Sequence, residues 1–262
     1  MRRGRHPRWL TWSFVRVAVV APTYQEAGNI VRFLETVRAA APEASIIIVD
    51  DNSPDGTGRL AEETGTRIGD VQVIHRAGKL GLGSAYREGF QAALDLGVDV
   101  VVSMDVDFSH DPNVIPKLLG LIENGADVAL GSRYVPGGGT VNWPWHRRML
   151  SRWGNRYTAF ILDLPVRDCT GAFRAVRAEV LRAVRPDSTR AEGYAMLTEF
   201  VRRFARGGYT IAEYPITFVD RVEGVSKMSG RIVAESMVRV TLWGIRDRVQ
   251  RLRAAVGGRR RS

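Results

Sequence analysis

Short apolar runs alternate with amphipathic stretches through residues 16–131. Nearly continuous runs of Val, Ile and Ala are typical of strands that are covered on both faces of a parallel sheet. The intervening stretches repeat apolar residues at helical spacing. The pattern predicts strands at residues 17–21, 46–49, 71–74, 98–104 and 126–130, and helices at residues 27–40, 57–67, 82–96 and 112–123.

Repeated strand and helix units predict an α/β fold with a mostly parallel central sheet flanked by helices. Ligands bind such sheets at the carboxyl ends of the strands. Asp111 precedes Pro112, and this pair is typical of a capped first helical turn. Gly, Pro and Trp then dominate residues 132–150, where we expect a long functional loop. The later pattern predicts helices at residues 147–162, 191–206 and 231–253, and a strand at residues 210–218.

The formal charge of +10 is concentrated at the two ends of the chain. Residues 1–9 contain four arginines and no acid, residues 246–262 contain seven arginines and one acid, and the segment between them is neutral overall. A nucleic-acid-binding protein more often has a basic stripe on its folded surface, so we expect no nucleic-acid partner. Basic ends favour an anionic membrane surface, which contributes about 1 kcal/mol per nearby Arg. Solvated ends without a partner are the alternative.

The last predicted helix contains an apolar stripe among arginines, formed by Val233, Met237, Val240, Ile245, Val249 and Leu252. An interfacial membrane helix and packing on the core both fit this pattern. No apolar run approaches the ~18–20 residues of a transmembrane helix, and residues 17–21 are too few for a secretory signal. A single cysteine, Cys169, suits a reducing compartment. We therefore expect a cytoplasmic protein that meets the membrane peripherally.

Acidic residues follow two of the predicted strands. Asp50 and Asp51 end the second strand, and Asp105 and Asp107 form a D-x-D motif at the end of the fourth. Mg²⁺ and Mn²⁺ prefer oxygen ligands, and Mg²⁺ commonly binds through one or two carboxylates plus substrate phosphates. Turn formation is the alternative, and it is stronger for the first pair than for the D-x-D. His110 follows the motif, and we expect it to fill the turn rather than approach a metal.

Further polar residues follow the other strands. Tyr24 and Glu26 lie just past the first strand, where a ring and a carboxylate could stack on a base and hydrogen-bond to it. Arg133 ends the fifth strand and should point into the same crevice, where its planar guanidinium matches a phosphate. Other candidate phosphate ligands follow in later loops, namely Arg147, Ser151, Arg221 and Lys227.

With these residues in view, the chain resembles the dolichol- or polyprenol-phosphate mannose synthases of glycosyltransferase family 2. The resemblance runs from about residue 17 to residue 227. It rests on the motifs PTYQE at 22–26, VDDNSPDGT at 49–57, LGLGSAY at 80–86, MDVDFSH at 104–110, GSRY at 131–134, DCTGAFR at 168–174 and FVDRVEGVSK at 218–227. Departures from the family pattern are mild, and Val106 stands where the family usually has Ala.

The resemblance implies a GT-A fold and divides the chain into a basic extension (1–15), a catalytic domain (16–230) and a C-terminal helix with a basic tail (231–262). It also implies that GDP-mannose is the donor. The guanosine would be surrounded by Pro22, Tyr24, Glu26, Val49 and Asp51, and the diphosphate and metal would meet Asp105, Val106 and Asp107. Donor phosphates or sugar would meet Arg133, Arg221 and Lys227, and the acceptor phosphate would meet Arg133, Arg147 and Ser151.

The chemistry expected from these residues is a single in-line displacement at mannose, with inversion. A lipid phosphate, whose second pKa is near 6, is largely dianionic at neutral pH, so no general base is needed. Asp107 and Arg133 are then the residues that we expect to act in catalysis. Transfer of glucose or another sugar to the same lipid remains an alternative, as does a non-catalytic subunit that recruits a membrane protein. The choice between Mg²⁺ and Mn²⁺ and the need for a membrane-protein partner stay open.

Overall fold

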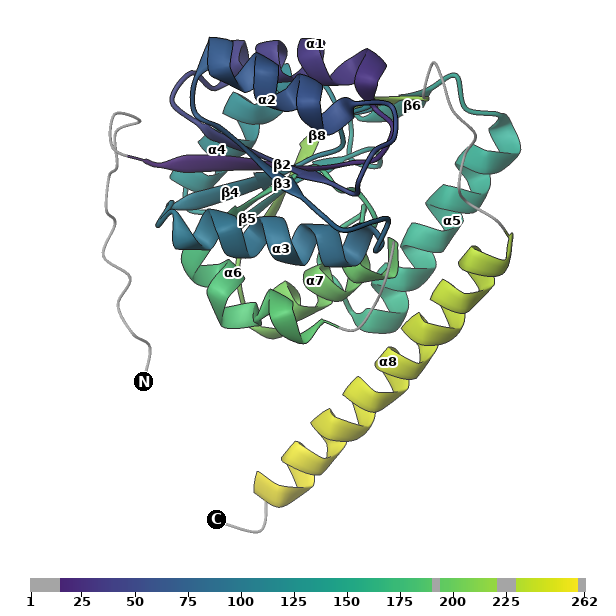
Figure 1. Cartoon of the computed structure of the whole chain (residues 1–262). Helices are drawn as coiled ribbons and strands as arrows, with labels where there is room; N and C mark the ends of the chain where they lie inside the picture. Colours follow the sequence, from purple (N-terminus) through teal and green to yellow (C-terminus); the bar gives the residue numbers. More distant parts are fainter. Residues whose placement is uncertain (1–14, 190–193, 221–229, 259–262) are drawn as a thin grey trace.

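A seven-stranded sheet lies between two layers of helices (Figure 1). The computed structural model describes residues 15–189, 194–220 and 230–258. The strands of the central sheet are β1 (Val17–Thr23), β2 (Ser45–Asp50), β3 (Val71–His75), β4 (Val100–Ser103), β5 (Val128–Ser132), β7 (Arg174–Arg177) and β8 (Ile211–Pro215). A separate two-stranded parallel ribbon pairs β6 (Gly139–Val141) with β9 (Thr217–Val219).

The order of the central sheet is β3-β2-β1-β4-β7-β5-β8. All neighbours pair in parallel except β7, which is antiparallel to both β4 and β5. The prediction of a mostly parallel sheet flanked by helices is therefore confirmed. The sequence pattern did not predict β7, because this four-residue strand has an arginine at each end and no long apolar run.

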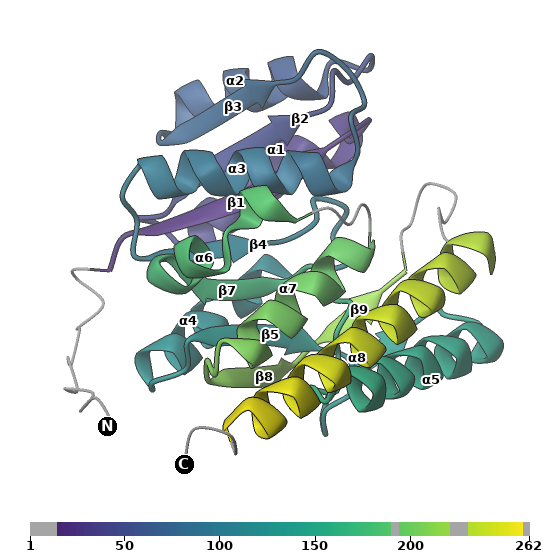
Figure 2. The same ribbon diagram turned by 90° about the horizontal axis from the view of Figure 1, so that it is seen from below.

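Helices cover both faces of the sheet (Figures 1 and 2). One face packs against α1 (Ala27–Ala40), α2 (Thr57–Ile68) and α4 (Ile115–Glu123), and the other against α3 (Leu82–Asp95), α6 (Ala178–Val184) and α7 (Tyr194–Arg206). Within β1, Val19 packs on the face that α1, α2 and α4 cover. Ala18 and Val20 pack on the face that α3, α6 and α7 cover. Burial on both faces explains why the strands are apolar at consecutive positions.

Two further helices, α5 (Trp145–Leu162) and α8 (Gly230–Gly258), lie side by side along one flank (Figure 2). The hydroxyls of Tyr157 and Thr241 form a hydrogen bond of 2.8 Å between them. A Cβ atom on Gly244 would lie 2.5 Å from Cγ2 of Ile161, so a glycine is needed for this close approach. The far end of α8 extends beyond the body of the molecule (Figure 1).

Most predicted boundaries agree with the structure, and α1 coincides with the predicted helix. The predicted helix at 112–123 begins with a 3-10 turn, η2 (Pro112–Val114), and the Asp111 carboxylate caps it by accepting a hydrogen bond from the Asn113 backbone N–H at 2.9 Å. The single strand predicted at 210–218 is wrong. It forms β8 and β9, which belong to different sheets. The partner changes at Ile216, whose N–H donates to the Ser132 carbonyl at 3.0 Å while its own carbonyl accepts the Gly139 N–H at 3.0 Å.

The prediction of one apolar stripe along the last helix is also wrong for the side chains that the structure describes. Val240 is buried, whereas Ile245 and Val249 are exposed. Five residues turn a helix by about 140°, so positions 240 and 245 cannot face the same way. Val233 and Leu252 lie outside the described side chains. Across the described residues, no helix combines the length and the hydropathy that a membrane span needs.

Candidate active site

Asp50 organises the loop that follows β2. Its Oδ1 accepts hydrogen bonds from Thr23 Oγ1 at 3.0 Å and Ser53 Oγ at 2.6 Å, and its Oδ2 accepts one from the Ser53 backbone N–H at 2.9 Å. The turn interpretation is therefore confirmed for Asp50. Asp50 therefore holds the loop, and the carboxylate of the next residue, Asp51, makes a different contact at the same edge of the sheet.

Asp51 forms a buried ion pair with Arg76, the first residue after β3. Arg76 Nε also lies 3.0 Å from a carboxylate oxygen of Glu88, and its Nη2 donates to Ser84 Oγ. Arg76 is 7% exposed. Arg76 could not be assigned a role from the sequence, because a pair 25 residues apart leaves no signature in local spacing.

The predicted nucleoside-binding residues gather at the carboxyl ends of β1 and β2. Pro22 and Val49 are opposite each other in the parallel register, and Asp51 donates its backbone N–H to the Thr23 carbonyl at 3.0 Å. Two of the group lie just beyond β1. The Lys79 ammonium lies 3.9 Å from the ring centroid of Tyr24, and Glu26 accepts a hydrogen bond from the Asn29 side chain at 2.8 Å.

The D-x-D motif follows β4. Tyr86 donates its hydroxyl to Asp105 Oδ1 at 3.3 Å, and Asp107 Oδ1 accepts the Ser109 backbone N–H at 3.1 Å. Val106, the residue between the two aspartates in the sequence, is buried. The turn interpretation thus holds for one oxygen of Asp107, and the motif still presents two neighbouring carboxylates.

Two buried ionisable groups lie near the end of β4, namely Tyr86 beside Asp105 and Arg174 opposite Ser103 in the β4–β7 register. Burial raises the pKa of Tyr86 well above its usual value, and the negative charge of Asp105 adds to the shift, so the hydroxyl keeps its proton and acts as a donor. Burial lowers the pKa of Arg174 to about 10, which leaves the guanidinium charged at neutral pH. Its Nη1 donates to the Leu197 carbonyl at 3.1 Å. Both residues lie within motifs of the resemblance, but the sequence gave neither of them a role.

His110 packs in the turn after β4, as expected. Its ring centroid lies 5.4 Å from that of Phe173 and 5.2 Å from that of Phe218, and the residue is 2% exposed. The Asp105 backbone N–H points to its Nδ1 at 3.5 Å. His110 therefore supports the D-x-D loop through packing.

Arg133 forms a buried bidentate ion pair with Asp168. Its Nε and Nη2 each donate to one carboxylate oxygen at 2.7 Å, and Nη2 also donates to Thr170 Oγ1 at 2.7 Å. Burial acts to raise the pKa of Asp168, but the Arg133 charge and hydrogen bonds outweigh it, so this pKa lies below its usual value. The loop that carries Asp168 precedes β7. Because β7 is antiparallel, this loop reaches the edge of the sheet where the parallel strands end.

The predicted acceptor residues are linked through two aromatic side chains. Tyr134 donates its hydroxyl to Ser151 Oγ at 2.6 Å, and its ring centroid lies 5.2 Å from the Arg133 guanidinium carbon. The Trp143 ring lies 4.1 Å from the same atom of Arg147 and 5.7 Å from that of Arg133. The structure therefore brings the three acceptor residues together. Arg147 also pairs with an Asp220 oxygen at 2.8 Å. The remaining candidates, Arg221 and Lys227, lie outside the described residues.

The donor set at the end of β4 fits a hard divalent cation. Asp105 and Asp107 supply carboxylate oxygens on one short loop, and Mg²⁺ typically takes one or two carboxylates while substrate phosphates and water fill its other positions. Among the described residues, no group of three or more His, Cys, Asp or Glu is arranged to hold a metal. Asp105 and Asp107 are thus the described residues that would hold a cation, with substrate phosphates and water in its other positions.

Sheet order, carboxylate loop and arginine-rich edge together define a class of enzyme, a glycosyltransferase with the GT-A fold. The chain belongs to glycosyl transferase family 2, whose family model matches residues 18–185. It is 44% identical to polyprenol monophosphomannose synthase of Mycolicibacterium smegmatis, over 92% of this chain and 91% of the relative. It is 45% identical to undecaprenyl-phosphate mannosyltransferase of Micrococcus luteus, over 93% of this chain and all of the relative. The resemblance to the polyprenol-phosphate mannose synthases is confirmed.

Solved structures share the fold at lower identity. Glucosyl-3-phosphoglycerate synthase from Mycobacterium tuberculosis, in complex with Mn²⁺, UDP and phosphoglyceric acid, matches with a TM-score of 0.63 and 18% identity, over 90% of this chain and 79% of that one. A mannosyltransferase from Pyrobaculum calidifontis, in complex with GDP-mannose and Mn²⁺, matches with a TM-score of 0.57 and 16% identity, over 90% of this chain and 64% of that one. These likenesses establish the GT-A fold.

Proposed function

We propose that the protein transfers mannose from GDP-mannose to a polyprenyl phosphate and so makes polyprenyl-phosphate mannose. The observation that carries this proposal is the identity of 44–45%, over more than nine-tenths of the chain, with two relatives that are named for mannosyl transfer to polyprenyl phosphates. A GDP-mannose donor is also supported by the fold neighbour that binds it.

The nucleoside of the donor is assigned to the ends of β1 and β2. Tyr24 and Glu26 offer a ring and a carboxylate there, and Pro22 and Val49 lie opposite each other in the register of the two strands. Asp51 is held by Arg76, so its carboxylate keeps one orientation before the donor arrives. A carboxylate that is already oriented favours donor binding, because little side-chain freedom is lost on association.

Asp105 and Asp107 are assigned to a divalent cation, Mg²⁺ or Mn²⁺. Two fold neighbours hold Mn²⁺ together with a nucleotide or a nucleotide sugar. When bound, such a cation acts as a Lewis acid that neutralises the charge of a diphosphate leaving group. Tyr86 donates to Asp105 and so fixes one of the carboxylates that would hold the cation.

Arg133, Arg147 and Ser151 are assigned to the acceptor phosphate, and Arg133 also faces the donor phosphates. Arg221 and Lys227 are assigned to the donor phosphates or sugar. The pairing of Arg133 with Asp168 fixes the plane of its guanidinium, and Trp143 covers both Arg133 and Arg147. Fixed cations aligned with two anions lower the barrier through positioning and electrostatic stabilisation.

The reaction is a single displacement at the anomeric carbon of mannose. A phosphate oxygen of the lipid forms the new bond while the bond to the diphosphate breaks, and GDP leaves with the electron pair. The α-linked donor thus gives a β-linked product. The attacking phosphate is largely dianionic at neutral pH, so no side chain has to remove a proton. A lipid acceptor would bring the enzyme to a membrane, and we propose that it works there peripherally, on the cytoplasmic face, alone or with a membrane-protein partner.

Transfer of radiolabelled mannose into organic-extractable lipid tests the proposal. Purified protein is incubated with GDP-mannose, a polyprenyl phosphate and Mg²⁺ or Mn²⁺, and we expect labelled lipid that disappears with EDTA. Label from UDP-glucose or GDP-glucose, but not from GDP-mannose, would keep the reaction class and overturn the sugar. Absence of transfer from every donor would favour a recruiting subunit.

Asp107→Ala tests the role of the D-x-D motif. We expect transfer to fall at least about a hundredfold with the fold preserved, because a group that stabilises developing charge is lost. Asp111→Ala is the matched control, since it removes a carboxylate that caps a nearby turn. That variant should lose about 1 kcal/mol of unfolding free energy and retain transfer. Equal transfer by the two variants would contradict the assignment of Asp107.

A further inference from the structure

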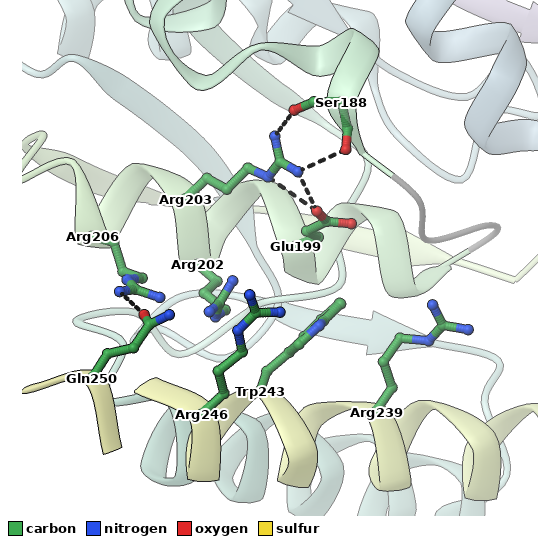
Figure 3. A pocket seen from close by; sticks show the side chains of 9 residues that line it. All are labelled: Ser188, Glu199, Arg202, Arg203, Arg206, Arg239, Trp243, Arg246 and Gln250. Carbon is green, nitrogen blue, oxygen red and sulfur yellow. Dashed lines mark hydrogen bonds and ion pairs between the residues drawn. The ribbon is translucent and has the colours of Figure 1, made fainter. Parts of the chain in front are cut away.

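An arginine-rich cavity lies between α7 and α8, outside the active site described above (Figure 3). Its volume is about 550 Å³. Side chains of η3 (Pro186–Ser188), α7 and α8 line it, and they include five arginines, at positions 202, 203, 206, 239 and 246. No step of the proposed transfer uses these residues.

The cavity has an excess of positive charge. Arg202 and Arg206 share the buried carboxylate of Asp247, and Arg203 pairs with Glu199. Arg239 and Arg246 are exposed and form no ion pair with any residue that the structure describes. Among the described residues, five guanidinium groups thus face two carboxylates, which leaves an excess of three positive charges. Guanidinium groups match phosphate oxygens in geometry as well as charge.

Figure 3 shows how the side chains converge from the two helices. Arg246 extends from α8 towards Arg202 and Trp243, and Arg239 extends along the same side of α8. The Trp243 ring lies 5.7 Å from the Arg202 guanidinium carbon. Trp243 also packs against the apolar core, and tryptophan is enriched where proteins meet the interfacial region of a bilayer.

A row of exposed apolar residues borders the cavity along α8. Val238, Leu242, Ile245 and Val249 are 40–61% exposed. Each immediately precedes a residue that lines the cavity, at 239, 243, 246 and 250. One residue turns a helix by about 100°, so a cationic stripe and an apolar stripe run side by side along α8.

We propose that this cavity binds the phosphate headgroup of an anionic bilayer phospholipid while the apolar stripe contacts its acyl chains. A soluble phosphate would need the arginines but not the adjacent stripe, and a bilayer phospholipid uses both. The inference rests on the proposed function, because a lipid-phosphate acceptor brings the enzyme to a bilayer. The site would therefore orient the enzyme by a second lipid contact, separate from its substrate.

Vesicle binding tests the proposal. The full chain is sedimented with phosphatidylcholine vesicles that contain 0 or 30% phosphatidylglycerol, without donor, acceptor or metal. We expect Arg239→Gln/Arg246→Gln to lower partition onto the anionic vesicles about ten- to thirtyfold, since each arginine near such a surface contributes roughly one factor of five. Leu242→Ser/Ile245→Ser should weaken binding to both vesicles.

Arg59→Gln/Arg67→Gln is the matched control. It removes the same charge from exposed ion pairs on α2 and keeps the basic ends of the chain. An equal loss in the two arginine variants would overturn the site and leave only general attraction. Two further outcomes would also overturn it: millimolar inorganic phosphate binding that Arg239→Gln/Arg246→Gln abolishes while vesicle binding stays intact, or a dimer that Leu242→Ser/Ile245→Ser dissociates with vesicle binding unchanged.

The binding measurement is independent of the transfer reaction. A wild-type protein that binds anionic vesicles but transfers no mannose would leave this site standing and refute the proposed function. A protein that transfers mannose but shows no preference for anionic vesicles would refute this site and leave the proposed function standing.

Discussion

Replacing Asp168 by Asn tests whether Arg133 depends on a buried counter-charge. The Asp168 side chain is fully buried, and each of its oxygens accepts a hydrogen bond of 2.7 Å from Arg133. Asn keeps the shape but removes the charge, so the guanidinium stays buried without a partner ion. Breaking a buried ion pair costs about 3–5 kcal/mol of unfolding free energy. For a chain of this size, that corresponds to a fall of about 6–20 °C in Tm.

Urea unfolding at pH 7, followed by circular dichroism, measures this loss. Glu35→Gln is the control, because it also converts a carboxylate into an amide opposite an arginine. The Arg67–Glu35 pair has the same 2.7 Å separation, but its side chains are 58% and 46% exposed. Such pairs contribute about 0–1 kcal/mol. If Asp168→Asn lost no more stability than Glu35→Gln, burial would not decide the strength of the Arg133 pair and the reasoning would be refuted.

The same variant makes a prediction about pH. Burial alone would raise the pKa of Asp168, but Arg133 outweighs it and holds the pKa below the unfolded value of about 3.9. The stability from this group is therefore fully present above about pH 4 and is lost as pH falls through the folded pKa. The gap between wild type and Asp168→Asn should stay constant near neutrality and narrow in acid. A gap that widened on acidification would contradict the assignment.

Two further substitutions address the loops around the site. Gly138→Ala should cost about 1–3 kcal/mol of unfolding free energy, because its Cβ would lie 2.5 Å from the Ser132 carbonyl oxygen. Thermal unfolding should show a much smaller loss for Gly139→Ala, where nothing lies within 4 Å. Arg76→Gln leaves Asp51 buried without its cation and should raise the KM for the donor with little change in kcat. Restoration of KM by Arg76→Lys would support positioning, whereas an unchanged KM in Arg76→Gln would contradict it.

Local patterns predicted the elements whose burial follows from their own sequence. Helix α1 coincides with its prediction, and both faces of β1 are covered as the continuous apolar run indicated. Strand β7 could not be predicted in this way. It is four residues long with an arginine at each end. It forms because β4 and β5 each pair with it in antiparallel register. The change of sheet after Pro215 depends in the same way on the partners of the two halves.

Residues of the candidate site could likewise be predicted only where a local sequence pattern marks them. The D-x-D carboxylates and Arg133 could be predicted because they directly follow apolar strands. Arg76 and Asp168 could not be assigned a role, since their partners lie 25 and 35 residues away in the chain. The position of Ile245 on α8 was also predicted wrongly. A list of apolar residues does not reveal which side of a helix its neighbours already occupy, and α5 and α7 occupy the side that contains Val240.

Strand β7 also sets the distance between two parts of the candidate site. It separates β4, which ends in the carboxylate pair, from β5, which ends in Arg133. Adjacent strands are about 4.8 Å apart, so the backbones at these two strand ends are held about 10 Å apart by backbone hydrogen bonds. The spacing between the loop with Asp105 and Asp107 and the loop with Arg133 is thus set by the order of the strands. If the proposed function holds, a change of sugar specificity would have to come from the side chains on these loops rather than from their spacing.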